Sequence, residues 1–161
     1  MVRHSSYEAD CGICRSNAGE VESAGGVVFA NDLWMVHHTG APFPLAGWFL
    51  LQPQRHVQGP ARFNDAECEN FGPALRHFMR TLEVVTGAPR TYIVAFGESV
   101  PHMHAHLVPR YADLADDEIA WNLADRFRAI GDGRQLGVDE AEVQRVIEAY
   151  RDALQADPPP R

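Results

Sequence analysis

The sequence predicts a single α+β domain with an antiparallel sheet of about five strands, one helix inserted between the third and fourth strands, and a helical C-terminal extension. Three observations support this fold class. Short runs rich in β-branched and aromatic residues alternate with turn signals. Two segments carry apolar residues at the spacing of an amphipathic helix. Finally, a chain of 161 residues can bury one core but not two large ones.

The first three strands lie early in the chain. Residues 27–30 and 33–37 are rich in strand formers and flank Asn31-Asp32, a turn-prone pair that predicts a hairpin. A proline-containing connection then leads to GWFLLQP, which predicts a third strand of about five residues.

Residues 64–86 predict the inserted helix. Asn64, followed three residues later by Glu67, can form a capping box at its start. Pro73 predicts either a kink or a later start, because a proline inside a helix removes a backbone hydrogen bond. One face of the helix collects apolar side chains at steps of four and three residues, namely Phe71, Leu75, Phe78, Leu82 and Val85.

Two strands and the extension follow this helix. TYIVAF predicts the fourth strand, and HMHAHLVPR at residues 102–110 predicts the fifth. We then expect a short helix with a loop, a final helix that Asp139 and Glu142 cap, and a frayed tail, DPPPR. The apolar positions of the final helix are Val143, Val146, Ile147, Tyr150 and Leu154.

Composition and charge exclude several classes of protein. Acidic residues number 22 against 14 basic ones, which argues against binding to a nucleic acid polymer. All the basic residues are arginine, so a lysine Schiff base, a P-loop lysine and a lysine general base are excluded. The sequence contains no secretory signal and no run of membrane-spanning length. We therefore expect a cytoplasmic protein without a membrane partner.

The cysteines indicate a metal or redox site rather than a disulfide. Cys11 and Cys14 form a C-x-x-C pair, which in a reducing compartment more often binds a metal or is redox-active. Two unrelated buried thiols remain the alternative. Cys68 falls on the inserted helix, where we expect it to contribute to packing.

Three of the eight histidines alternate in HMHAH: His102, His104 and His106. On a strand, such residues project from one face about 7 Å apart, while Met103 and Ala105 face the other way. A solvated strand face that uses histidine is one interpretation. The others are a hydrolytic zinc site with an open coordination position and a nucleophilic imidazole whose neighbours hold a phosphate.

HMHAHLVP resembles the motif of the histidine triad (HIT) family of nucleotide hydrolases and transferases, in which three histidines alternate with apolar residues. GESV before the triad and GWFLLQPQRHV upstream resemble further segments of that family. The resemblance covers residues 8–111, so we assign residues 1–111 to a HIT-like domain and 112–161 to a helical extension of the same domain. It also implies the HIT fold and a homodimer.

The resemblance implies a role for each triad histidine. His104 matches the nucleophile that takes the nucleotidyl group from an α-phosphate, and His106 matches the histidine that contacts the phosphate and helps the leaving group. In relatives with an N-terminal C-x-x-C, the first triad histidine and a more distant one join the cysteines around Zn²⁺. The corresponding ligands here are Cys11, Cys14, His56 and His102. Because four ligands complete a tetrahedral site, we expect one structural zinc ion per chain.

Two departures from the family pattern concern the substrate. Glu98 stands where the family often has a glutamine that touches the phosphate, whereas Ser99 is retained. We expect both residues in the substrate-binding site. The acidic residue that commonly binds the ribose hydroxyls is missing, and the candidate substitutes are His37, His38 and Asp32.

The sequence thus predicts a hydrolase or transferase that cleaves a phosphoanhydride or phosphoramidate bond at the α-phosphate of a nucleotide, through a nucleotidyl intermediate on His104. Dinucleoside polyphosphates and nucleoside phosphoramidates are the substrates that the resemblance implies. Two alternatives remain open. One is a nucleotide-binding regulatory protein with weak or no catalysis, and the other is a zinc-dependent hydrolase that uses the triad as ligands.

Overall fold

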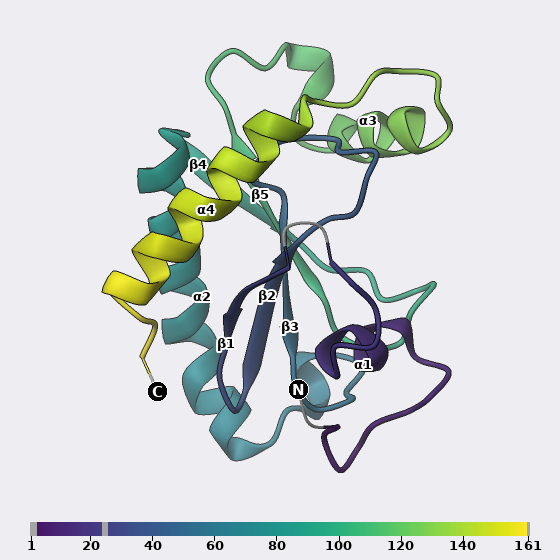
Figure 1. The fold of residues 1–161 in the computed structure, drawn as a ribbon, viewed down its shortest axis with the longest axis vertical. Coiled ribbons are helices and arrows are strands. Elements are labelled where there is room, and N and C mark those ends of the chain that lie inside the picture. The colour runs from purple at the N-terminus through teal and green to yellow at the C-terminus, as the bar shows by residue number, and fades with distance from the viewer. Residues whose placement is uncertain (1–2, 24–25, 161) are drawn as a thin grey trace.

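The computed structural model describes residues 3–23 and 26–160. One five-stranded antiparallel sheet has the strand order β1-β2-β3-β5-β4 (Figure 1). The strands are β1 (Val27–Ala30), β2 (Trp34–His38), β3 (Phe49–Pro53), β4 (Arg90–Val94) and β5 (Ala105–Arg110). The helices are α1 (Gly12–Asn17), α2 (Asp65–Thr86), α3 (Asn122–Gly131) and α4 (Glu140–Ala156). The predicted α+β fold class is confirmed.

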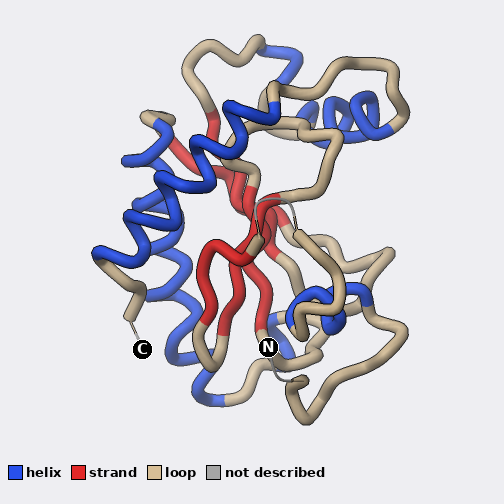
Figure 2. The backbone as a smooth tube through the Cα atoms, viewed as in Figure 1, coloured by secondary structure: helices blue, strands red, loops and turns tan. Residues whose placement is uncertain are grey.

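The helices cover both faces of the sheet. Figure 2 shows two long helices, α2 and α4, against one face, and Figure 1 places α1 and α3 on the other side, near opposite ends. None of the helices that the structure describes is long and apolar enough to cross a membrane.

The main core lies between the sheet and the two long helices. Alternate strand residues face α2 and α4, as the period of two along a strand requires. Phe49 of β3 packs on Tyr150 of α4, with ring centroids 4.5 Å apart. The predicted apolar positions of α4 are all buried, namely Val143, Val146, Ile147, Tyr150 and Leu154. The final helix therefore contributes directly to the main core.

Helix α2 begins and ends as the sequence predicts. Asn64 accepts a hydrogen bond from the backbone of Glu67, whose side chain accepts one from the backbone of Asn64, so the capping box is confirmed. Gly87 ends the helix with a φ of 69°, in the left-handed region that favours glycine. Pro73 lies inside the helix, and the alternative of a later start is therefore wrong.

The fifth strand is shorter than predicted. It begins at Ala105, so His102 and His104 precede it and only His106 lies on it. The register pairs Leu51 with Ala105, and its continuation would place Pro53 opposite the residue two before Ala105. Pro53 has no N–H to donate to a ladder, which explains why pairing stops there.

Other details also differ from expectation. Helix α1 was not predicted from the cysteine segment. Cys68 is exposed rather than packed. Asp139 caps α4 as predicted, although its side chain accepts from the backbone N–H of Ala141. The tail is tethered rather than frayed, because the carbonyl of Pro160 accepts a 2.8 Å hydrogen bond from the side chain of Asn70 on α2.

Candidate functional site

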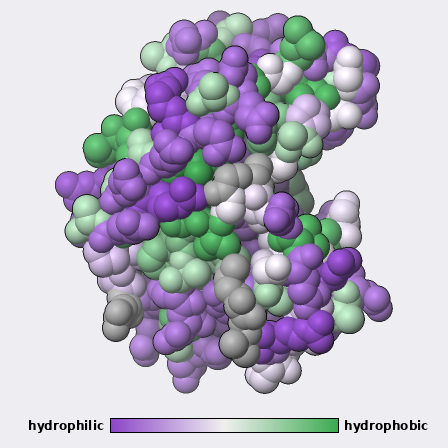
Figure 3. Space-filling view, viewed as in Figure 1, coloured by the Kyte–Doolittle hydropathy of each residue, from purple (hydrophilic) through white to green (hydrophobic). Residues whose placement is uncertain are grey.

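The predicted site residues lie on the sheet face that α2 and α4 leave free. His106 on β5 pairs with Leu50 of β3 on one side and Val94 of β4 on the other. His104 directly precedes β5. Helix α1 lies near one end of this face and α3 near the other (Figure 1). The space-filling surface is indented at the right of Figure 3, between the lobe that carries α3 and the lobe that carries α1.

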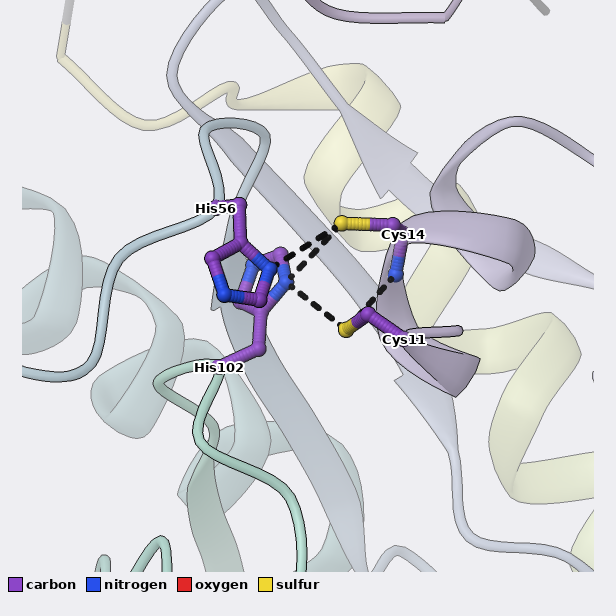
Figure 4. A group of neighbouring side chains, drawn as sticks. All are labelled: Cys11, Cys14, His56 and His102. Carbon is purple, nitrogen blue, oxygen red and sulfur yellow. Dashed lines mark hydrogen bonds between the residues drawn. The ribbon is translucent and has the colours of Figure 1, made fainter. Parts of the chain in front are cut away.

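The two cysteines and two of the histidines form a compact cluster at the α1 end. The ligand atoms of Cys11, Cys14, His56 and His102 all lie within 4.8 Å of one another and point to a common centre (Figure 4). His102 Nδ1 lies 3.5 Å from both sulfurs, and His56 Nδ1 lies 3.3 Å from Cys14 Sγ. In a tetrahedral zinc site, bonds of about 2.3 Å to sulfur and about 2.05 Å to nitrogen give a sulfur–nitrogen edge of about 3.6 Å. The three measured sulfur–nitrogen distances are therefore close to those of a tetrahedral metal site.

Helix α1 positions the two cysteines of the cluster. Cys11 is the N-cap of α1, and its sulfur accepts from the backbone N–H of Cys14, one turn into the helix. Burial raises the pKa of the Cys14 thiol to about 11. A thiolate at this position therefore needs a nearby cation to stabilise it, and a metal ion bound here would supply that charge.

Hydrogen bonds outside the cluster orient the two histidine rings. His102 Nε2 donates to the carbonyl of Pro53 at 3.0 Å, so the lone pair of the ring lies on Nδ1. His56 Nε2 lies 3.3 Å from a carboxylate oxygen of Glu8. Such outer partners set the tautomer of a metal-binding histidine. Both rings therefore present Nδ1 to the cysteines.

His104 and His106 form a separate pair, with ring centroids 5.4 Å apart. His104 Nδ1 donates to the carbonyl of His102 at 2.8 Å, so the lone pair of its Nε2 is free. His106 Nδ1 lies 2.9 Å from the indole nitrogen of Trp48, which can only donate, so Nε2 of His106 carries the hydrogen. Burial, with a smaller contribution from His104, lowers the pKa of His106 to about 4 and keeps that ring neutral. The pair thus presents one acceptor, Nε2 of His104, and one donor, the Nε2–H of His106.

A cavity of about 370 Å³ opens beside His106. Ser99 and His106 line it, together with Val94 and Val108 from the sheet. Its opposite wall is α3, through side chains that include Phe127. Glu98, which the sequence places in the substrate site next to Ser99, is exposed in the same loop.

The candidate substitutes for a ribose-binding acid have different surroundings. His38 is enclosed in the core, where Nδ1 faces the carbonyl of Thr39 and Nε2 accepts from the backbone N–H of Gly47. His37 is also buried, and its Nε2 lacks a hydrogen-bond partner within the described part of the chain. Asp32 is exposed in the β1–β2 turn. His38 is therefore the least accessible of the three.

Sequence reasoning missed two components of the site. Trp48 was not singled out, although its position directly before β3 places its side chain on the face of His106. The wall supplied by α3 was also missed, because nothing local to Trp121 or Phe127 indicates what they pack against. The available signal was Trp121 and Phe127, two aromatic residues close together in an extension rich in acidic residues.

No protein-family model and no curated protein sequence matches this chain. Solved structures do match. A zinc-bound histidine triad family protein from Mycobacterium smegmatis aligns over 91% of this chain and 96% of its own, at 15% identity and a TM-score of 0.65. A hypothetical histidine triad nucleotide-binding protein from Sulfolobus tokodaii aligns over 91% and 93%, at 13% identity and 0.65. A histidine triad protein from Bradyrhizobium japonicum aligns over 79% and 88%, at 24% identity and 0.60. This chain therefore has the fold of the histidine triad proteins.

Proposed function

We propose that this chain is a nucleotidyl hydrolase or transferase that cleaves a phosphoanhydride or phosphoramidate bond at the α-phosphate of a nucleotide. The observation that carries the proposal is the pair of opposite tautomers, in which His104 offers a lone pair and the adjacent His106 offers an N–H. A displacement at phosphorus needs both a nucleophile and a donor toward the departing atom. A similar fold in a protein described as nucleotide-binding supports the substrate class.

The reaction follows from these groups in two displacements. Nε2 of His104 attacks the α-phosphorus, a phosphorus–nitrogen bond forms, and the bond to the leaving group breaks with its electron pair on the leaving atom. A phosphate leaves as its anion, whereas an amine nitrogen takes up a proton from solvent as it departs. The N–H of His106 and the hydroxyl of Ser99 donate to that atom. Water or another acceptor then attacks phosphorus and loses its proton to solvent, and the electron pair of the phosphorus–nitrogen bond returns to His104. His106 acts as a neutral hydrogen-bond donor throughout, because its other nitrogen accepts from Trp48.

We further propose one structural zinc ion held by Cys11, Cys14, His56 and His102. Four ligands leave no open position for a catalytic water, so this ion would stabilise the fold rather than take part in the reaction. The zinc-bound neighbour of the same fold supports this assignment. Because the carbonyl of His102 accepts from His104 Nδ1, fixing His102 would also aim the nucleophile. Zinc bound instead by the three triad histidines is less supported, since His102 Nδ1 faces the cysteines.

A homodimer belongs to the same proposal. Strand β4 lies at one edge of the sheet. Ile93 on this strand and Phe96 just after it are both large apolar residues with exposed side chains. An exposed sheet edge with apolar residues is a template for strand pairing between two copies.

Trapping the covalent intermediate tests the proposed function. The protein is incubated with adenosine 5′-phosphoramidate or a dinucleoside polyphosphate, quenched, and examined by intact-mass spectrometry. Wild type should carry one nucleotidyl group, and His104→Ala and His104→Gly should carry none. His77→Ala, on α2 at the opposite side of the sheet, is the matched control and should behave as wild type.

Two outcomes would contradict the proposal. Turnover that mild chelation abolishes, with no trapped intermediate, would favour a zinc-dependent hydrolase. Tight nucleotide binding without turnover of either substrate would favour a regulatory nucleotide-binding protein.

A further inference from the structure

We propose that α3 makes the cavity beside His106 a leaving-group pocket that selects apolar and aromatic leaving groups over a phosphate-rich second nucleotide. This inference rests on the proposed function and specifies its substrate class. It is carried by the position of the cavity, by the side chains that line it and by the charges around it.

The position of the cavity matches the departing side of the reaction. In a displacement at phosphorus, the leaving atom lies on the side opposite the attacking nitrogen. Ser99 and His106, the two donors on that side, line the cavity, whereas His104 lies outside the lining that the structure describes. A leaving group that receives hydrogen bonds from Ser99 and His106 therefore extends toward α3.

The lining of the cavity is aromatic and unusually exposed. Trp121 and Phe127 keep 81% and 42% of their surface accessible, although both border the same cavity. Large apolar side chains gathered at one exposed site mark a surface that a ligand covers. Flat aromatic rings favour a ligand that is itself aromatic or apolar.

The surrounding charges disfavour a polyphosphate. Of the described lining residues, Arg128 alone is a cation, and it is paired with Asp125 at 2.5 Å. The loop that leads to α3 carries Asp113, Asp116, Asp117 and Glu118, of which Glu118 is paired with Arg126 of α3. A chain of phosphates beyond the α-phosphate would therefore not find, among the described lining residues, the cationic clamp that such groups need.

The pocket is formed before a ligand arrives, because α3 is held in place. Leu123 of α3 is buried in a small core with Leu45, Trp48 and Val108. Arg126 of α3 donates to the carbonyl of Pro44 at 3.0 Å. A wall fixed by packing can discriminate between leaving groups without the cost of ordering a loop.

Substrates that differ only in the leaving group test the inference. We would measure kcat/KM for adenosine 5′-phosphoramidate, its N-phenethyl derivative and a dinucleoside tetraphosphate, with Phe127→Ala, Trp121→Ala and wild type. Both side chains are exposed, so the fold should be retained. Because the ring of Phe127 also packs on Trp48, with centroids 5.3 Å apart, Trp121→Ala is the variant that alters the pocket without altering this contact. The control is Val84→Ala on α2, which is 77% exposed and remote from the cavity.

Wild type should prefer the phenethyl derivative to the unsubstituted compound roughly tenfold, as burial of an apolar group predicts. That preference should fall by at least about fivefold in Phe127→Ala or Trp121→Ala and should persist in Val84→Ala. Turnover of phosphoramidates without this preference, or faster turnover of the tetraphosphate, would overturn the leaving-group pocket and leave the proposed function intact. No turnover and no intermediate with any of the substrates would overturn both.

Discussion

The α1 end and the α3 end of the histidine-bearing sheet face contain similar residues in different surroundings. At the α1 end, His102 is fully buried and its ring lies between two sulfurs and the carbonyl of Pro53. At the α3 end, His104 and His106 are only half-buried, and His106 borders an open cavity. The first arrangement suits a closed structural metal site, and the second suits a group that must meet a substrate.

The comparison shows that alternation along HMHAH does not assign roles by itself. His102 belongs to the α1 end through its ring and to the α3 end through its carbonyl, which holds His104. The two ends are therefore distinct in chemistry but joined through one residue. Substitutions that act on one end at a time should separate them.

Removing a cluster cysteine should have the largest effect, and that effect is on stability. In Cys14→Ala we expect bound zinc to be lost and the free energy of unfolding to fall by several kcal/mol, because binding of a structural zinc ion contributes directly to folding. Elemental analysis and chemical denaturation measure the two effects. Cys68→Ala, an exposed cysteine outside the cluster, should change neither. Freshly purified wild type without zinc would contradict the assignment.

Acid should destabilise the α3 end through His38, whose Nε2 holds the backbone beside Trp48 by accepting from Gly47. Burial lowers the pKa of His38 to about 4 in the folded protein, against about 6.5 in the unfolded chain. Only the unfolded chain takes up this proton between those values. The contribution of His38 is therefore complete above about pH 6.5 and lost as the pH falls toward 4, by roughly 3 kcal/mol in all.

Urea unfolding at several pH values tests this prediction. The decline between pH 6.5 and 4.5 should be shallower in His38→Gln than in wild type, because glutamine keeps an acceptor for Gly47 without titrating. Equal slopes in the two proteins would show that His38 does not contribute.

Trp48→Phe should impair the α3 end and leave the α1 end unchanged. Phenylalanine keeps the apolar packing but removes the indole N–H, so His106 is free to adopt the other tautomer. We expect turnover to fall about tenfold, the equivalent of about one hydrogen bond, while zinc content is unchanged. The ¹⁵N chemical shifts of His106 should report the change of tautomer directly. An unchanged tautomer with a reduced rate would mean that Trp48 acts through packing alone.

The smallest effect is expected at the outer partner of His56. Glu8 is 63% exposed, so Glu8→Gln should weaken zinc binding by about tenfold or less. Competition with a chelator measures this affinity. Turnover of the zinc-loaded variant should equal that of wild type, and a larger loss of activity than of zinc affinity would contradict the separation of the two ends.

Much of this architecture can be predicted from the sequence because it depends on local signals. The capping box at Asn64 and the apolar face of α2 need only neighbours within one or two turns. The start of β5 and the tether at Pro160 could not be predicted, since each depends on a distant partner. Helix α1 is also too short for a periodic signal.

The sequence alone determined which chemical groups are available, namely a C-x-x-C pair, three alternating histidines and an extension rich in acidic residues. Only the tertiary structure decided which nitrogen of each imidazole is free. That choice depends on the carbonyls of Pro53 and His102 and on the indole of Trp48, which approach the rings only in the folded chain. The cavity beside His106 was decided in the same way, because its two walls come from a sheet and a helix that meet only through packing.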